Sequence, residues 1–435
     1  MPRTLNLLST LSASLIVACG GGSSAGPDGG SSGANDGGAL RDALAPFDAV
    51  SHASDAALTD GATHTPDAFV ASLDGGGSDA PPTCSSTGLV CGGQCVDPSS
   101  DNNNCGGCGI TCNGTCALAR CALPLAEVEY GVGGIVADAT HVYWTDLGVA
   151  GGTGSVNRCP VGGCGMSPVI LASNLLFPTS LAIDATNVYY LVSGAIFDDS
   201  FGPASVQQTA IAGPGDGGLA PIVLASNLAY TPTSIGVDAT EVFWNAGFGG
   251  PLVECSIGGC GGTPTTFGSA SWQADYFVIA SGTMYFLGSA GTTSGVLTCP
   301  TSGCSTPGSL FTGFGGVLFL GGSTLYGWDA TVSSDGSETG VIDSCPFSGC
   351  NDTPVSYLNG ADAIVGAVAD ATNVYWIDAP KGQVLRCPAA GCTGTPDVIY
   401  SFYGGAQDPE ALIPMALDAT SLYIGADEIV RVTPK

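Results

Sequence analysis

A motif that recurs seven times constrains the fold of this chain more than any other feature of its sequence. Asp-Ala-Thr followed by an apolar and aromatic run begins at Asp138, Asp184, Asp238, Asp370 and Asp418, and degenerate copies begin at Ser281 and Gly322. The copies lie about 47 residues apart, and repeats of roughly 40–50 residues with several short strands are typical of β-propellers. No long stretch has the 3.6-residue period of a helix. The sequence therefore predicts an all-β fold, a seven-bladed β-propeller over residues 122–435.

Each repeat contains enough short apolar runs for a four-stranded blade. In the first repeat we expect strands at 135–137, 142–145, 154–159 and 168–173, with Asp138-Ala-Thr as the turn between the first two. An Asp at the start of a turn accepts hydrogen bonds from nearby backbone N–H groups, so the repeated Asp is expected to be structural. Its repetition also argues against catalysis, because an active site needs a given acid or base once.

The last repeat ends after only three strands, at Glu428 to Val432. A candidate for the missing fourth strand is Leu123 to Tyr130, which precedes the first inner strand. We expect this segment to pair beside the C-terminal strand, so that the ring closes without an open edge.

Five repeats share a second motif, Cys-x4-Cys, between their third and fourth strands. Two cysteines that flank a four-residue loop can face each other at a separation that a disulfide accepts. The second repeat has Thr209 and Pro214 at these positions, and joint loss is what paired cysteines predict. Zinc is disfavoured, because each loop offers only two thiols. The predicted pairs are Cys159–Cys164, Cys255–Cys260, Cys299–Cys304, Cys345–Cys350 and Cys387–Cys392.

The first repeat contains the sequence Tyr-Trp-Thr-Asp within Val142–Asp146, and Val374–Asp378 is close to it. The strands Ser155–Arg158 and Gln383–Arg386 follow, each ending in Arg. In these features residues 122–435 resemble propellers of the low-density-lipoprotein-receptor type. That family has six blades, whereas the seven repeats favour seven. The resemblance implies a protein-binding or scaffold propeller and identifies no ligand, and the tryptophans are expected to pack between blades.

Residues 1–18 have the features of an export signal. Arg3 precedes an apolar run from Leu5 to Ala18, which is too short to span a bilayer as a mature helix. Ile16-Val-Ala-Cys19 resembles the bacterial lipobox, which implies a diacylglycerol group on the Cys19 thiol and cleavage before it. The alternative is an ordinary signal peptide with an incidental cysteine. Because Gly20 replaces the Asp that often signals inner-membrane retention, we predict a lipid-anchored protein of the outer membrane or cell surface.

Two further segments precede the predicted propeller. Residues 19–83 begin with the lipidated Cys19 and are mostly Gly, Ser, Ala, Asp, Pro and Thr, too few apolar groups to offset the entropy of ordering, so we expect a flexible tether. Residues 84–121 contain eight cysteines. In an exported chain this favours a module of four disulfides over zinc sites, with a connectivity that spacing cannot determine.

Composition excludes several partners and chemistries. The chain has 8 Lys+Arg against 37 Asp+Glu, a formal net charge of −29, so nucleic acid and anionic lipid surfaces would be repelled. The histidines are His52, His64 and His141, and only the last lies in the predicted propeller. A Ser-His-Asp set or a His-ligated metal centre therefore lacks its parts. We predict no catalytic set, cofactor or metal site.

One insertion in the second repeat is a candidate binding loop. It spans residues 197–203 and contains Asp198 and Asp199. Propellers often place binding groups in such loops. We predict a surface-exposed binding or scaffold protein for an unidentified protein or glycan. Two alternatives remain: a secreted propeller hydrolase or lyase that uses paired carboxylates on polysaccharide or peptide, and a calcium-stabilised structural protein of the envelope.

Overall fold

The computed structural model describes the chain from residue 83 onward with short gaps, and these residues belong to one compact unit. The described ranges are 83–128, 130–148, 152–194, 204–213, 220–228, 230–247, 249–312, 316–332, 338–361, 364–402, 412–426 and 428–435. In these ranges no helix is long and apolar enough to cross a membrane. The predicted signal peptide, Cys19, the predicted tether, Asp198 and Asp199 lie outside the described residues.

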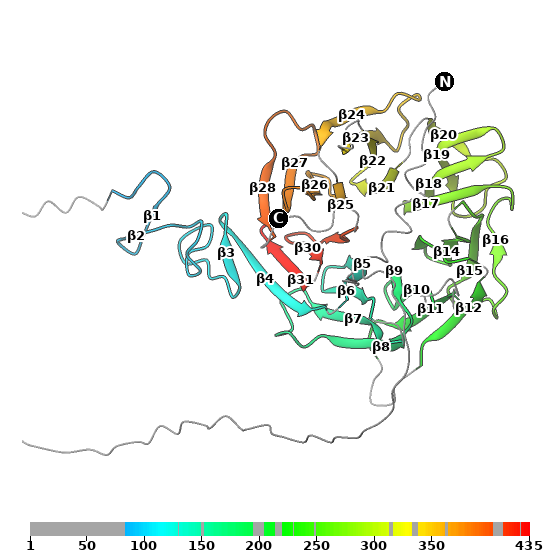
Figure 1. The fold of residues 1–435 in the computed structure, drawn as a ribbon, viewed down its shortest axis with the longest axis horizontal. Helices are drawn as coiled ribbons and strands as arrows, with labels where there is room; N and C mark the ends of the chain where they lie inside the picture. The colour runs from blue at the N-terminus through cyan, green and yellow to red at the C-terminus, as the bar shows by residue number, and fades with distance from the viewer. Residues whose placement is uncertain are drawn as a thin grey trace, which may run out of the picture. The chain divides into compact units, whose positions relative to one another are not determined.

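Apart from the two-stranded sheet of β1 and β2, the described strands form seven antiparallel sheets, the blades, which are arranged in a ring (Figure 1). Innermost strands of consecutive blades contact one another from β5 through β9, β13, β17, β21, β25 and β29 back to β5. This order confirms the predicted seven-bladed β-propeller. Blade 1 consists of β5 (Val132–Ala137), β6 (His141–Asp146), β7 (Gly154–Pro160) and β8 (Val169–Leu175), and blade 2 of β9 (Pro178–Ile183), β10 (Asn187–Val192), β11 (Ala204–Ala210) and β12 (Ile222–Leu228). Blade 3 consists of β13 (Ile235–Val237), β14 (Glu241–Asn245), β15 (Leu252–Ser256) and β16 (Thr265–Thr266), and blade 4 of β17 (Gln273–Ala280), β18 (Thr283–Ala290), β19 (Thr293–Pro300) and β20 (Gly308–Phe311). Blade 5 consists of β21 (Gly316–Gly321), β22 (Thr324–Val332), β23 (Glu338–Pro346) and β24 (Val355–Ala361), and blade 6 of β25 (Ile364–Ala369), β26 (Asn373–Asp378), β27 (Gln383–Pro388) and β28 (Asp397–Ser401).

Blade 7 is built from both ends of the chain, as predicted. It contains β29 (Met415–Leu417), β30 (Leu422–Gly425) and β31 (Glu428–Thr433), and β4 (Arg120–Glu127) pairs antiparallel with β31. Because β4 comes from the N-terminal side, its pairing joins the first blade to the last and leaves no open edge there.

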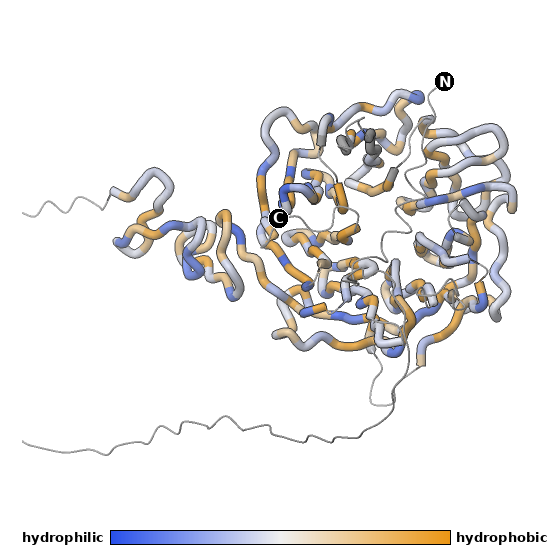
Figure 2. Tube along the Cα trace, in the orientation of Figure 1, coloured by the Kyte–Doolittle hydropathy of each residue, from blue (hydrophilic) through white to orange (hydrophobic). Residues whose placement is uncertain are grey.

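The core is divided among the blade junctions. Each of seven buried clusters contains side chains from two consecutive blades, because both faces of a blade are covered by its neighbours. Figure 2 accordingly shows hydrophobic residues along the strands of every blade. Trp144 illustrates the arrangement, since it is fully buried at the junction of blades 7 and 1, where it packs with Leu125 and Tyr423. Burying such large aromatic surfaces stabilises each junction.

The two ends of the blades differ. In a four-stranded meander, the first turn and the third turn lie at one end, and the second turn and the link to the next blade lie at the other. The Asp-Ala-Thr turns and Cys-x4-Cys hairpins therefore share one face, which we name the disulfide face. The opposite face, here the variable face, carries connections of unequal length, from residues 291–292 between β18 and β19 to residues 193–203 between β10 and β11.

All five Cys-x4-Cys pairs are disulfide-bonded, with Cα–Cα separations of 5.2–5.6 Å. Glycine precedes the second cysteine in each loop, and its φ lies between 96° and 140°, a region that strongly favours glycine. Thr209 lies opposite Val188 as Cys159 lies opposite Val142, which confirms that Thr209 replaces the first cysteine in blade 2. Each disulfide thus fixes one tight hairpin on the disulfide face.

Removing one hairpin disulfide should lower stability without changing the fold. For the double variant Cys159→Ala/Cys164→Ala we expect a loss of about 2 kcal/mol in unfolding free energy, since closing a small loop removes little entropy from the unfolded chain. Urea denaturation under oxidising conditions measures the change. Blade 2 already forms without this bond, so loss of the native circular-dichroism spectrum in the variant would contradict a purely local role.

The cysteine-rich segment is joined to the ring by a shared sheet. Its eight cysteines form four disulfides, Cys84–Cys95, Cys91–Cys108, Cys105–Cys116 and Cys112–Cys121. It contains the hairpin β1 (Leu89–Cys91) and β2 (Gln94–Val96), and β3 (Thr115–Ala117), which pairs with β4 as the fifth strand of blade 7. The predicted boundary between residues 121 and 122 therefore falls inside β4.

Candidate functional site

The repeated Asp side chains organise the turns of the disulfide face. In blade 2, Asp184 Oδ1 accepts hydrogen bonds from the backbone N–H groups of Thr186 (2.6 Å) and Asn187 (2.7 Å), and Oδ2 accepts one from the Tyr189 hydroxyl (2.7 Å). The backbone contacts recur at Asp138, Asp238, Asp370 and Asp418, and the tyrosine contact recurs at Asp138 and Asp418. These carboxylates are structural, as predicted.

The hydrogen bonds also set the protonation of these groups. Partial burial alone would raise the pKa of each carboxyl, but hydrogen-bond donors favour the charged form. These are the donors of the turn in all five blades, together with a tyrosine hydroxyl at Asp138, Asp184 and Asp418, Thr301 at Asp238 and Lys435 at Asp370. The pKa of all five carboxyls therefore lies below its usual range. Burial, together with the charge of Asp138, raises the pKa of Tyr143 to about 12, which keeps its hydroxyl protonated as a donor.

The Tyr-Trp-Thr-Asp residues of blade 1 also have structural roles. Tyr143 donates to the turn carboxylate of Asp138, and Trp144 fills the junction with blade 7. Thr145 Oγ1 donates to the backbone carbonyl of Thr179 in the inner strand of blade 2 (2.6 Å). Asp146 accepts the N–H of Gly148 (3.1 Å). These contacts hold the strands and the turn after β6 in place, so the motif has a structural role in blade 1.

Arginines on third strands link neighbouring blades at the disulfide face. Arg158 of blade 1 donates to the carbonyl of Ile211 in blade 2, and Arg431 of blade 7 donates to the carbonyl of Val161 in blade 1. Arg386 of blade 6 donates to the Lys435 carbonyl of blade 7 (2.9 Å). The sequence resemblance singled out Arg158 and Arg386 but did not predict this contact.

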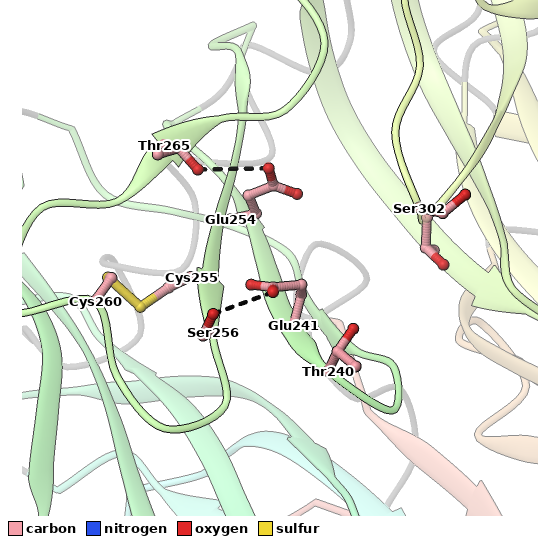
Figure 3. A pocket seen from close by; sticks show the side chains of 9 residues that line it. Thr240, Glu241, Glu254, Cys255, Ser256, Cys260, Thr265 and Ser302 are labelled. Carbon is pink, nitrogen blue, oxygen red and sulfur yellow. Dashed lines mark hydrogen bonds between the residues drawn. A yellow bond between two sulfur atoms is a disulfide. The ribbon is translucent and has the colours of Figure 1, made fainter.

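A polar pocket of about 360 Å³ lies at the junction of blades 3 and 4 on the disulfide face. Figure 3 shows the Glu241 and Glu254 carboxylates on the blade 3 side and Ser302 across the open space. The Ser256 hydroxyl donates to Glu241 Oε1 (3.1 Å), and the Thr265 hydroxyl contacts Glu254 Oε1 (3.4 Å). Burial and the neighbouring charge of Glu241 raise the pKa of Glu254. The pocket thus concentrates negative charge beside hydroxyl groups.

The variable face offers a different surface. Tyr230 is 72% exposed, and Tyr130 and Leu412 are also exposed, in three different links between blades. A small apolar hollow at the junction of blades 5 and 6 is lined by Val317, Phe319, Trp328, Ile364 and Leu412 among others. Exposed aromatic and apolar side chains of this kind are common in recognition surfaces.

The predicted site residues have different outcomes. The ten hairpin cysteines are in disulfides, whereas Cys19, Asp198 and Asp199 lie outside the described residues. In sequence, both Asp residues fall between β10, which ends at Val192, and β11, which begins at Ala204. Within the described ranges, no three His, Cys, Asp or Glu side chains are grouped to hold a metal ion.

Comparison with known proteins gives fold likeness only. No family model and no curated protein matches the chain. Among solved structures, virginiamycin B lyase from Staphylococcus aureus is 13% identical with a TM-score of 0.46, over 72% of this chain and 98% of the lyase. Kuenenia stuttgartiensis hydrazine synthase is 9% identical with a TM-score of 0.49, over 70% and 95% of the two chains. A nidogen/laminin complex is 12% identical with a TM-score of 0.32, over 60% and 76%.

Proposed function

We propose that this chain is a lipid-anchored surface protein whose propeller binds a protein or glycan through its variable face. The observation that carries the proposal is the unequal use of the two faces. Turn carboxylates, disulfides and inter-blade arginines occupy the disulfide face in a repeated pattern, whereas the connections of the variable face differ from blade to blade. Loops of this kind, held by a rigid scaffold, commonly carry recognition.

The anchor and the tether complete the proposal. A diacylglycerol group on Cys19 would hold the chain at a membrane, and residues 20–83, with their Gly, Ser and Asp, would let the propeller move away from it. The nine disulfides of the described residues suit an oxidising compartment outside the cytoplasm.

A binding screen tests the proposed recognition. The soluble chain beginning at residue 83 is applied to an array of glycans and envelope proteins, and a saturable signal without turnover is expected. Tyr230→Ala, on the variable face, should weaken the signal at least tenfold. Met166→Ala is the matched control, because Met166 is exposed at the disulfide face. Weakening by the control alone, or cleavage of the bound glycan or protein, would overturn the proposal.

The predicted loop is tested in the same screen. The double variant Asp198→Ala/Asp199→Ala should weaken binding, because in sequence both residues fall between β10 and β11, whose ends Val192 and Ala204 lie toward the variable face. Mass spectrometry of the full-length protein from its bacterial membrane should separately find a diacylglycerol adduct on Cys19. An unmodified Cys19 thiol would exclude the proposed anchor.

A further inference from the structure

The seven blades are internal copies of one another, so a position can be compared across them. In blades 1, 6 and 7 the third strand carries an arginine directly opposite a tyrosine of the second strand. These pairs are Arg158 and Tyr143, Arg386 and Tyr375, and Arg431 and Tyr423. In blade 3, Glu254 is paired with Phe243 in the same register. Glu254 therefore occupies the position that holds an arginine in blades 1, 6 and 7.

The carbonyl that such an arginine reaches can also be identified in each blade. Val161, Ile211 and Lys435, whose carbonyls accept the arginines, each donate their N–H to the carbonyl of the Thr in the first turn. In blade 4 the same contact runs from Thr301 N–H to the carbonyl of Gly282 (2.9 Å). Thr301 is therefore the equivalent residue, and it lines the pocket that also contains Glu254.

At the junctions of blades 1–2, 6–7 and 7–1, an arginine reaches from one blade to a carbonyl of the next, and we call this place the arginine slot. The pocket lies at the same place in the blade 3–4 junction, but it carries negative rather than positive charge. Blades 2, 4 and 5 have the neutral residues Gln208, Thr298 and Ser344 at this position. Only blade 3 places a carboxylate there, and Glu241 on the adjacent strand adds a second. The junction of blades 3 and 4 therefore has a pocket where other junctions hold a guanidinium, and carboxylates that would attract one. Blade 3 itself supplies no arginine at this position.

The chain itself shows how a guanidinium is bound in such a slot. In blade 6, Arg386 uses Nη1 on the Lys435 carbonyl and Nη2 on Asp397 Oδ2 (2.6 Å). One carbonyl of the next blade and one carboxylate of the same blade therefore satisfy one guanidinium. The pocket offers the same pair of groups through Thr301 and Glu254, since a planar guanidinium has several donors and pairs well with carboxylates.

We propose that the pocket at the junction of blades 3 and 4 binds an arginine side chain presented by a partner protein. The guanidinium would lie between the carboxylates of Glu254 and Glu241 and the backbone carbonyl of Thr301. This site is on the disulfide face, so it goes beyond the recognition proposed for the variable face and does not depend on it.

Calorimetric titration of the full-length protein with the peptide acetyl-Gly-Arg-Gly-amide tests the proposal at low ionic strength, where ion pairs are least screened. We expect saturable binding, at least tenfold weaker for the lysine counterpart because an ammonium lacks the planar fork of donors. Glu254→Gln should weaken binding of the arginine peptide at least tenfold. Equal binding of both peptides, or calcium binding without peptide binding, would overturn the proposal.

A second variant tests the slot itself. Glu254→Arg places in blade 3 the residue found at this position in blades 1, 6 and 7, so it should abolish peptide binding and raise the midpoint of thermal unfolding. Glu254→Gln is the matched control, since it removes the charge but supplies no guanidinium and should not raise the midpoint. Undiminished peptide binding to a folded Glu254→Arg variant would contradict the site, and the result for Glu254→Gln still decides the question if Glu254→Arg does not fold.

Discussion

Replacing Leu125 with alanine should lower the unfolding free energy by about 2–5 kcal/mol, the range for truncating a well-packed leucine. Leu125 is 1% exposed and packs at the junction of blades 7 and 1, although it belongs to β4, the strand that enters blade 7 from the N-terminal side. A cavity at this position weakens the packing between blades 7 and 1, where strands from the two ends of the chain meet. Urea denaturation of the chain beginning at residue 83 measures the loss.

A second substitution in the same strand provides the control. Glu127 is exposed at the end of β4, so Glu127→Ala should change the unfolding free energy by no more than about 0.5 kcal/mol. If Leu125→Ala has as small an effect as Glu127→Ala, then β4 does not bury Leu125 and the ring is not closed by this strand.

Replacing Asp184 with alanine should cost about 1–3 kcal/mol at neutral pH and reduce the loss of stability in acid. The carboxylate accepts bonds from Thr186, Asn187 and the hydroxyl of Tyr189, and hydrogen bonds to a charged group are among the stronger ones. Although burial raises the pKa of Asp184, these bonds lower it below the unfolded value near 3.9. The stabilisation is therefore complete above about pH 5 and is lost as the pH falls through the folded pKa.

The acid transition measures this contribution, followed as unfolding free energy from pH 6 to pH 2. All five turn carboxylates share the lowered pKa, so the wild-type chain should lose stability steeply in acid, and Asp184→Ala should show a shallower decline. Asp343 is the control, because burial raises its pKa and its removal should not make the decline shallower. An unchanged slope in Asp184→Ala, or a shallower one in Asp343→Asn, would show that the turn carboxylates do not control acid stability.

Much of the architecture could be predicted because the sequence repeats. Each Asp-Ala-Thr copy marks the turn between the first two strands of one blade, and copies as degenerate as those at Ser281 and Gly322 still begin β18 and β22. The absence of a fourth strand after Glu428 indicated closure by the N-terminal segment. The joint replacement of both cysteines in blade 2 indicated that the hairpin cysteines pair.

Other features depend on contacts between segments and have no local pattern. The four disulfides of residues 84–121 are fixed by the fold of that segment, and 105 pairings are compatible with eight cysteines. The addition of β3 to blade 7 required knowing that β4 continues into the cysteine-rich segment. The equivalence of Glu254 and Arg158 depends on the register of β14 and β15, which places Glu254 opposite Phe243 as Arg158 lies opposite Tyr143. The sequence did not predict it, because Glu and Arg are unlike residues.

Hydrogen–deuterium exchange of the chain beginning at residue 83 tests most directly whether the two ends of the chain close one ring. The backbone N–H groups of β4 that pair with β31 should be protected for as long as those of β31 and of the second strands of the other blades, because they unfold together with the ring. Rapid exchange throughout residues 122–127, with β31 still protected, would contradict closure by β4 and leave blade 7 with only three strands.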